Sequence, residues 1–343
     1  MWLWSQSSER TAGNRLKNFM QLNKKPLAAV IGALNIDLII HGLPHFASPG
    51  DQVNGQTVYL SPGGKGRNIA AMLSAWLKPG QVSMVGKLVQ DRHGLYRIPL
   101  HSLTEARIET QYIILDQARP DNLPTLSIFL NTTDGQRASY YLPGKNESLT
   151  PEELDRAQPL FEQLAANRGI VVLSLEMPLR TACHALSLAA DLGLRVMLDP
   201  GGQPPEEQVD FSPLFEYPIF LIKPNELEAE RLMGIKVTDF ASARQAASLL
   251  LDWGVQHVVI THGKHGAYAF SNTDGFPVPA SDFPVPPRAE STGCGDQVLA
   301  LLCIGAFHDK PFRDACQKAV LAGSLQYRQP GLAPILPNNP HFN

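Results

Sequence analysis

The stretch Glu290-Ser291-Thr292-Gly293-Cys294-Gly295-Asp296 indicates most about how this chain folds. It separates a proline- and glycine-rich segment, residues 275–287, from the apolar run 298–307, which predicts a helix buried on most sides. The start of a helix offers free N–H donors and the positive end of its dipole, and glycines let a ligand approach closely. The stretch therefore predicts an anion site at Gly293, Cys294 and Gly295, with Asp296 beside it. A simpler alternative is that Asp296 only caps the helix.

A second glycine-rich loop, Pro62-Gly63-Gly64-Lys65-Gly66-Arg67-Asn68, leads into residues 69–77, whose apolar positions recur at helical spacing. Upstream, an apolar strand predicted over 27–34 ends in Asn35-Ile36-Asp37. A period of two places Asn35 and Asp37 on one face at the C-terminal end of that strand, where open α/β sheets bind ligands. Amide, carboxylate and glycine-rich backbone together suit a compound with several hydroxyl groups.

The rest of the chain alternates apolar strands with amphipathic helices, which predicts an α/β fold with a mostly parallel sheet covered on both faces. The predicted strands are 170–175, 194–198, 219–222 and 258–260, and the predicted helices are 151–166, 178–192, 225–233 and 240–253. Two segments, about 42–61 and 111–142, alternate as antiparallel strands do, and Asp134-Gly135 predicts a hairpin turn.

Composition narrows the function classes. The 343 residues carry a net charge of −3, so there is no basic footprint for nucleic acid, and no apolar stretch is long enough to predict a membrane span. The four cysteines lack metal-site spacing, which favours reduced thiols in a cytoplasmic protein. Residues 1–26 are expected to be a poorly ordered extension without a signal peptide, followed by one domain over 27–343. A Walker loop and a G-x-S-x-G elbow are absent from the sequence.

Taken together, these motifs resemble the ribokinase/PfkB family of carbohydrate kinases. The 63–68 loop matches the family's G-G-K-G-x-N signature, and residues 290–296 match its D-T-x-G-A-G-D signature. Further matches follow in family order over about 27–337, at residues 46–51, 175–179, 223–230 and 258–266. The resemblance implies a ribokinase-like three-layer sandwich with a small β lid formed by the segments about 42–61 and 111–142.

The resemblance also implies ATP-dependent phosphorylation of a hydroxyl of a sugar or sugar-like molecule. Asp296 would be the general base, and the backbone of Gly293, Cys294 and Gly295 would form the anion hole. The residues that match the family's acceptor site are Asn35, Asp37, Gly63, Gly64, Lys65, Asn68 and Glu176. Those that match its nucleotide site are Asp199, Asn225, Thr261, Gly263 and Gly266. Asn225 and Glu228 would hold Mg²⁺ through water, and the lid could form a homodimer.

Two departures from the family pattern affect these expectations. Glu290 stands where the family has Asp, a residue that helps to form a potassium site in ribokinases. In this chain activation by K⁺ is therefore expected to be weak or absent. Cys294 stands where the family has Ala, and a thiol at a helix N-terminus can have a lowered pKa and oxidise readily.

Alternatives remain open on the sequence. G-G-x-x-R-N-I-A also resembles nucleoside and pseudouridine kinases. A phosphosugar acceptor would need cations such as Arg67 or Lys87, which form no cluster in the sequence. A non-catalytic sugar-binding sensor of the same fold is disfavoured because Asp296 is present.

Overall fold

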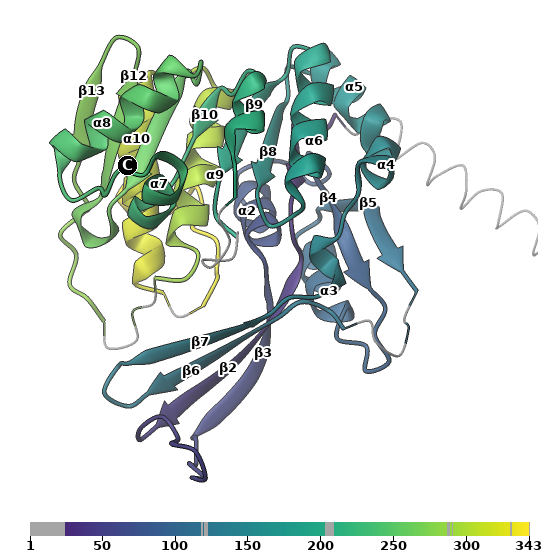
Figure 1. Cartoon of the computed structure of the whole chain (residues 1–343), viewed down its shortest axis with the longest axis vertical. Coiled ribbons are helices and arrows are strands. Elements are labelled where there is room, and N and C mark those ends of the chain that lie inside the picture. The colour runs from purple at the N-terminus through teal and green to yellow at the C-terminus, as the bar shows by residue number, and fades with distance from the viewer. Residues whose placement is uncertain are drawn as a thin grey trace, which may run out of the picture.

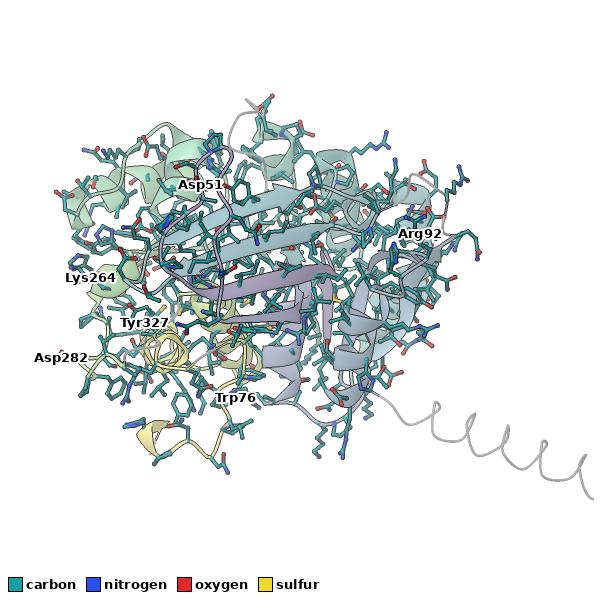
Figure 2. The ribbon with its side chains drawn as sticks, turned by 90° about the horizontal axis from the view of Figure 1, so that it is seen from below. Asp51, Trp76, Arg92, Lys264, Asp282 and Tyr327 are labelled. Atoms are coloured by element: carbon teal, nitrogen blue, oxygen red, sulfur yellow. The ribbon has the colours of Figure 1, made fainter. Side chains whose placement is uncertain are left out.

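The computed structural model describes residues 25–117, 119, 123–202, 209–286, 289, 291–329 and 331–342. These residues form a large body with a small β-sheet that projects from one side (Figure 1). Seen from below, the strands of the small sheet cross in front of the body (Figure 2). The predicted N-terminal extension lies outside the described residues, apart from Lys25 and Pro26.

The large sheet has nine strands within the described residues, in the order β13-β12-β11-β10-β9-β8-β1-β4-β5. Pairing is parallel from β11 through to β5, while β12 and β13 are antiparallel additions at one edge. Their bounds are β1 Ala28–Ile31, β4 Val82–Val89, β5 Glu109–Asp116, β8 Ile170–Ser174, β9 Arg195–Asp199, β10 Leu221–Ile222, β11 His257–Thr261, β12 Ala267–Ser271 and β13 Gly275–Val278.

Helices cover both faces of this sheet. Strand β1 shows why, because Ala29 and Ile31 join one apolar core while Ala28 and Val30 join the other. The first core is completed by α4 Pro151–Leu154, α5 Gln158–Ala166, α6 Leu179–Asp191, α7 Glu226–Met233 and α8 Phe240–Asp252. The second is completed by α2 Lys65–Ser74, α3 Arg97–Glu105, α9 Cys294–Phe307 and α10 Phe312–Tyr327. The predicted three-layer α/β fold is therefore confirmed.

Short 3₁₀ segments complete the described structure. The predicted helix over 151–166 is divided into α4, η2 and α5, and Pro159, which has no N–H to donate, stands in the first turn of α5. The 3₁₀ segments are η1 Lys145–Glu147, η2 Asp155–Ala157, η3 Ser212–Glu216, η4 Gly263–His265 and η5 Pro340–Phe342. None of the described helices is long and apolar enough to cross a membrane.

The small sheet consists of β3-β2-β6-β7, with bounds β2 Asn35–Leu43, β3 Thr57–Gly63, β6 Leu126–Thr132 and β7 Arg137–Leu142. The predicted hairpin at Asp134-Gly135 is present between β6 and β7, with Gly135 at φ 88°. The predicted bounds of the lid were partly wrong, because residues 111–116 belong to β5, parallel to β4 in the large sheet. An edge strand that is half-exposed on one face shows the same alternation as an antiparallel strand, so the pattern could not separate the two.

The predicted first strand is also shorter than expected. Strand β1 ends at Ile31, and Asn35 opens β2 of the other sheet instead of ending the same strand. Ala33 and Leu34 are fully buried where the chain passes between the sheets, so the apolar run continues through a break in the strand. Asn35 and Asp37, at the start of β2, nevertheless follow closely after the C-terminal end of β1, where open α/β sheets bind ligands.

Candidate active site

The glycine-rich loop before α2 is pressed against the end of β1. Gly64 has φ 89°, and a Cβ added there would lie 2.5 Å from the Ala33 carbonyl oxygen, so no larger residue fits without a shift. The Arg67 N–H donates to Ala33 O at 3.2 Å, which fixes the first turn of α2 over this crossing. The loop thereby places the side chains of Lys65 and Asn68 at the mouth of the sheet.

Asp296 contacts the first turn of α2 directly, at the residues that follow the glycine-rich loop. Helices α2 and α9 lie side by side, and Asn68 Nδ2 donates to Asp296 Oδ2 at 3.0 Å. The other carboxylate oxygen of Asp296 lies 3.7 Å from Lys65 Nζ. The N-cap of α9 is Gly293, and this cap makes no side-chain hydrogen bond, so capping does not account for Asp296. Two loops far apart in the sequence thus converge on one carboxylate that is 5% exposed.

A group that we call the lysine cluster surrounds Lys65 on its other side: Lys65, Asp199, Lys223 and Glu228. Lys65 Nζ lies 3.1 Å from Asp199 Oδ1 and 3.8 Å from Glu228 Oε1, and Lys223 Nζ lies 3.0 Å from Asp199 Oδ2. Burial by itself would favour a neutral Asp199, but Lys223 and Lys65 hold the pKa of this carboxyl well below its usual range. Burial likewise opposes the charge of Lys65, yet its carboxylate neighbours hold its pKa well above the usual value.

The sequence did not single out Lys223 as a site residue, although Lys223 begins a segment, 223–230, that matched the family. It stands just after β10 and is 1% exposed. A Cβ at Gly295 would lie 3.1 Å from Lys223 Nζ, so this ammonium faces the first turn of α9. A lysine after an apolar strand is usually a surface residue. The burial of Lys223 is explained by its ion pair with Asp199, at the end of the neighbouring strand β9.

The predicted anion hole differs in one donor from the expectation. The Cys294 N–H donates to Ser291 O at 3.2 Å and is occupied. Gly295 follows it in the first turn of α9, where N–H groups have no intrahelical acceptor. Together with the Lys223 ammonium, this turn offers positive potential beside Asp296.

The expectation of a lowered pKa for the Cys294 thiol is wrong. Burial, and then the nearby Asp296 carboxylate, raise its pKa to about 12. Both effects oppose a thiolate and outweigh the helix N-terminus.

Predicted acceptor residues gather on the small-sheet side of Asp296. The Lys65 N–H donates to Glu176 Oε2 at 2.6 Å, and Gly63 packs so closely on the Asp37 carboxylate that a Cβ there would overlap it. Burial raises the pKa of Asp37 to about 6, and the charges of Arg67 and Arg137 only partly oppose this. Burial raises the pKa of Glu176 to about 8, against the charge of Lys65. All three acceptor-side carboxyl groups, counting Glu147 after β7, have raised pKa values.

The cations suggested for a phosphosugar separate in the structure. Arg67 Nη1 donates to Asn68 Oδ1 at 3.1 Å, and burial lowers its pKa to about 10 although Asp37 and Asp296 raise it. Lys87 Nζ is instead bound to Glu153 Oε1 at 2.7 Å and lies 3.7 Å from Asp116. Arg137, which the sequence did not single out, reaches from β7 to Thr292 Oγ1 at 2.9 Å and connects the small sheet to the loop before α9.

The predicted nucleotide residues lie at the carboxyl ends of three neighbouring strands, with Asp199 at the end of β9 and the others after β10 and β11. Asn225 and Thr261 form a bridge between these strands, and the His262 N–H donates to Gly266 O at 2.8 Å to close a tight turn. That turn holds Gly263 and Gly266, with φ of 47° and 97°. Asn225 links the turn to the lysine cluster because it caps α7 reciprocally with Glu228.

A magnesium ion held through water fits these residues better than one bound directly. Asn225 Oδ1 and Glu228 Oε2 are both used in the cap, at 2.8 Å each, which leaves Glu228 Oε1 facing Lys65. Among the described residues no group of three His, Cys, Asp or Glu side chains could hold a metal ion. Mg²⁺ keeps several waters and needs few protein ligands, so one buried carboxylate oxygen suits it. Glu290 lies outside the described residues, so weak or absent activation by K⁺ stays a prediction.

The sequence pattern of the pfkB family carbohydrate kinases matches residues 25–339. The chain belongs to this family. Two relatives span nearly its whole length: it is 26% identical to a ribokinase of Arabidopsis thaliana, covering 97% of this chain and 84% of the relative. It is 28% identical to a deoxyribokinase of Salmonella typhi, covering 92% of this chain and 97% of that one.

Solved structures agree in fold. The structure of Arabidopsis thaliana ribokinase complexed with ribose and ATP superposes with a TM-score of 0.75 at 23% identity, covering 90% of this chain and 96% of that chain. Membership of the family makes this chain an ATP-dependent kinase.

Proposed function

We propose that this carbohydrate kinase transfers the γ-phosphoryl group of ATP to a hydroxyl of a sugar, with Asp296 as the general base. The observation that carries this proposal is the position of Asp296, held by Asn68, 3.7 Å from Lys65 and in the first turn of α9. The charge of this carboxylate acts on Asp37 and Glu176, and the residue before it, Gly295, faces the Lys223 ammonium. A hydroxyl bound there would have a base on one side and an anion site on the other.

The reaction needs alignment and charge neutralisation more than covalent chemistry. Asp296 takes the proton of the acceptor hydroxyl, whose oxygen forms a bond to the γ-phosphorus while the bond to the β-phosphate oxygen breaks and its electron pair leaves with ADP. Lys223 and the Gly295 N–H bind the transferring oxygens as charge moves across them. Asn68 and Lys65 keep the base oriented. Mg²⁺, held through water at Glu228, would neutralise charge on the nucleotide phosphates.

Replacing Asp296 tests the base assignment. Asp296→Asn keeps the hydrogen bond with Asn68 but cannot take a proton, so kcat should fall by ~10²–10⁴-fold with the Kd for sugar changed by no more than a few-fold. Asp282→Asn, at an exposed carboxylate, is the matched control and should keep full activity. Near-normal turnover by Asp296→Asn would refute the assignment.

The acceptor is tested by measuring ADP release with pentoses, hexoses, phosphosugars and nucleosides. We expect pentoses to be preferred, because the relatives named above are a ribokinase and a deoxyribokinase. Lys87 is committed to Glu153, which disfavours a phosphosugar. A higher kcat/KM for a nucleoside than for every sugar would favour the nucleoside-kinase alternative.

We also propose that the small sheet pairs with that of a second copy. The small sheet projects from the body (Figure 1). Large apolar side chains are exposed on its two edge strands: Val58, Tyr59 and Leu60 on β3, and Tyr140, Tyr141 and Leu142 on β7. Exposed apolar edge strands are usually covered in solution. Light scattering should give twice the chain mass, and Val58→Lys should shift it toward the monomer. A monomer mass for the wild type at micromolar concentration would contradict this.

A further inference from the structure

Glu147 lies in the acceptor site, although no sequence motif includes it. It is the last residue of η1, directly after the small sheet, and the preceding residue fixes its position. Asn146 is 2% exposed; its Nδ2 donates to Leu34 O at 2.5 Å and its Oδ1 accepts from Val89 N at 3.3 Å. These two bonds tie η1 to the exit of β1 and to the end of β4. Glu147 is therefore held beside the first residue of β2, and not on a free loop.

The side chains of Glu147 and Asn35 leave two acceptor atoms without a partner. Asn35 is 2% exposed, and its side chain makes a hydrogen bond that stabilises the Glu147 carboxylate. Asn35 Oδ1 and Glu147 Oε1 are both buried and accept no hydrogen bond. Buried acceptors without a donor are uncommon and cost free energy, so such a pair indicates a missing donor.

The groups around this pair show which ligand would supply that donor. Glu147 acts electrostatically on Glu176, whose Oε2 binds the Lys65 N–H and whose charge also feels Asp296. Glu147 therefore lies near the acceptor residues, beside Asn35, whereas Asp296 is held from α2 by Asn68. A ligand group between Asn35 and Glu147 would be distinct from the hydroxyl that meets Asp296.

We propose that Glu147 is a specificity-determining residue of the acceptor site, which together with Asn35 accepts hydrogen bonds from a second donor group of the substrate, a hydroxyl or an ammonium. This inference rests on the proposed sugar kinase function. Sugars that carry the donor satisfy both buried oxygens. A deoxy analogue leaves them unpaired and is rejected, as sites built for a hydroxyl reject substrates that lack it.

The test compares kcat/KM for D-ribose, 2-deoxy-D-ribose, 3-deoxy-D-ribose and 2-amino-2-deoxy-D-ribose in the wild type, Glu147→Ala and Glu147→Gln. For the sugars with the donor, Glu147→Ala should lower kcat/KM by ~10–100-fold, the value of one hydrogen bond to a charged group, mainly through KM. The analogue without that donor should change by less than ~3-fold, so discrimination is lost. The amino sugar separates the two donor types, because an ammonium loses more than a hydroxyl when Glu147→Gln removes the charge.

A purely structural role for Glu147 predicts a different result. It would lower kcat/KM equally for all four sugars, and equal loss would overturn the inference. Glu152→Gln, at an exposed glutamate of α4, is the matched control and should behave as the wild type. If the wild type phosphorylates none of the sugars, the proposed function fails, and calorimetric binding of the same four sugars still decides the role of Glu147. Binding that is absent, or that does not depend on Glu147, overturns it.

Discussion

The two sides of Lys65 treat buried charge in opposite ways. In the lysine cluster, Asp199 is fully buried but lies within 3.1 Å of two ammonium groups, and its pKa is held well below the usual range. On the acceptor side, Asp37 is buried and Glu147 and Glu176 are half-buried, and their removal from water raises their pKa values to about 6, 7 and 8. The chain itself supplies the partners of Asp199, whereas the acceptor-side carboxyl groups have too few partners to offset their removal from water.

This difference separates residues that hold the site in place from residues that recognise the substrate. A buried charge that is paired by the chain keeps one geometry whether or not a ligand is present, so the lysine cluster can position Lys65 and Lys223 in advance. Buried carboxyl groups without enough partners gain when a ligand brings hydrogen-bond donors. The acceptor-side carboxyl groups therefore lower the stability of the ligand-free protein and gain partners when the sugar binds. Their raised pKa values mark where the sugar is expected.

The largest expected effect concerns the lysine cluster. Asp199→Asn removes the charge between two lysines, one of which is 1% exposed, so the free energy of unfolding should fall by about 3–5 kcal/mol. The exposed Arg313–Asp274 pair, at 2.8 Å, is the control, and Asp274→Asn should cost no more than about 1 kcal/mol. Urea unfolding measures both.

A double variant sharpens this result. Asp199→Leu combined with Lys223→Met should recover much of the lost stability, because an apolar pair can replace a buried ion pair. Activity should remain low, since Lys223 faces the first turn of α9. Equal costs for Asp199→Asn and Asp274→Asn would remove the distinction between the two sides of Lys65.

The sequence predicted the part of the site that depends on local geometry. Asn68 and Asp296 each follow a glycine-rich loop at the start of a helix, and the structure joins them at 3.0 Å. The three-layer fold was equally accessible, because strands such as β8, which is apolar from Ile170 to Leu173, alternate with helices. Each loop and each strand is recognised from its neighbours in the chain, whereas the contact between the two loops is visible only in the structure.

The rest depends on neighbours far apart in the chain. Lys223 lies in a segment that matched the family but was given no role there, and no motif includes Glu147. Their roles follow from Asp199 and Asn35 on other elements. The lid boundary at residues 111–116 was misjudged because alternation records exposure on one face and not which sheet a strand joins. The pKa of Cys294 was misjudged because a helix start is visible in sequence, whereas the burial that outweighs it is not.

A pH series tests the acceptor side, where the expected change in stability is smaller than that of Asp199→Asn. Glu147 has a pKa of about 7 in the folded state against 4.5 when unperturbed, and Glu176 about 8 against 4.5. Between these values the two groups bind more protons in the folded state than in the unfolded state, so their contribution to the free energy of unfolding falls as pH rises from 5 to 8. Glu147→Gln should therefore stabilise the ligand-free protein at pH 8 and have little effect at pH 5.

The same series distinguishes the two sides of Lys65. The cost of Asp199→Asn should be the same at pH 5 and pH 8, because Asp199 stays ionised throughout. Glu152→Gln should show no pH-dependent gain, since Glu152 is exposed. Thermal unfolding at each pH, taken as the difference from the wild type, cancels the titrations common to all variants. A Glu147→Gln protein that is less stable than the wild type at pH 8 would contradict the charge deficit on the acceptor side.

The smallest effect is expected at Cys294, where burial and the Asp296 carboxylate both raise the pKa of the thiol. Because its pKa is raised to about 12, the thiol should react with iodoacetamide at pH 8 far more slowly than an unperturbed thiol such as glutathione. Cys294→Ala should keep kcat within ~3-fold of the wild type, since the thiol takes no part in the proposed proton transfer. Cys183→Ala, which removes the other half-buried cysteine, is the control for labelling. Rapid inactivation at pH 7 that Cys294→Ala abolishes would show that the helix N-terminus outweighs burial, and that a buried acid beside Asp296 can still ionise without a ligand.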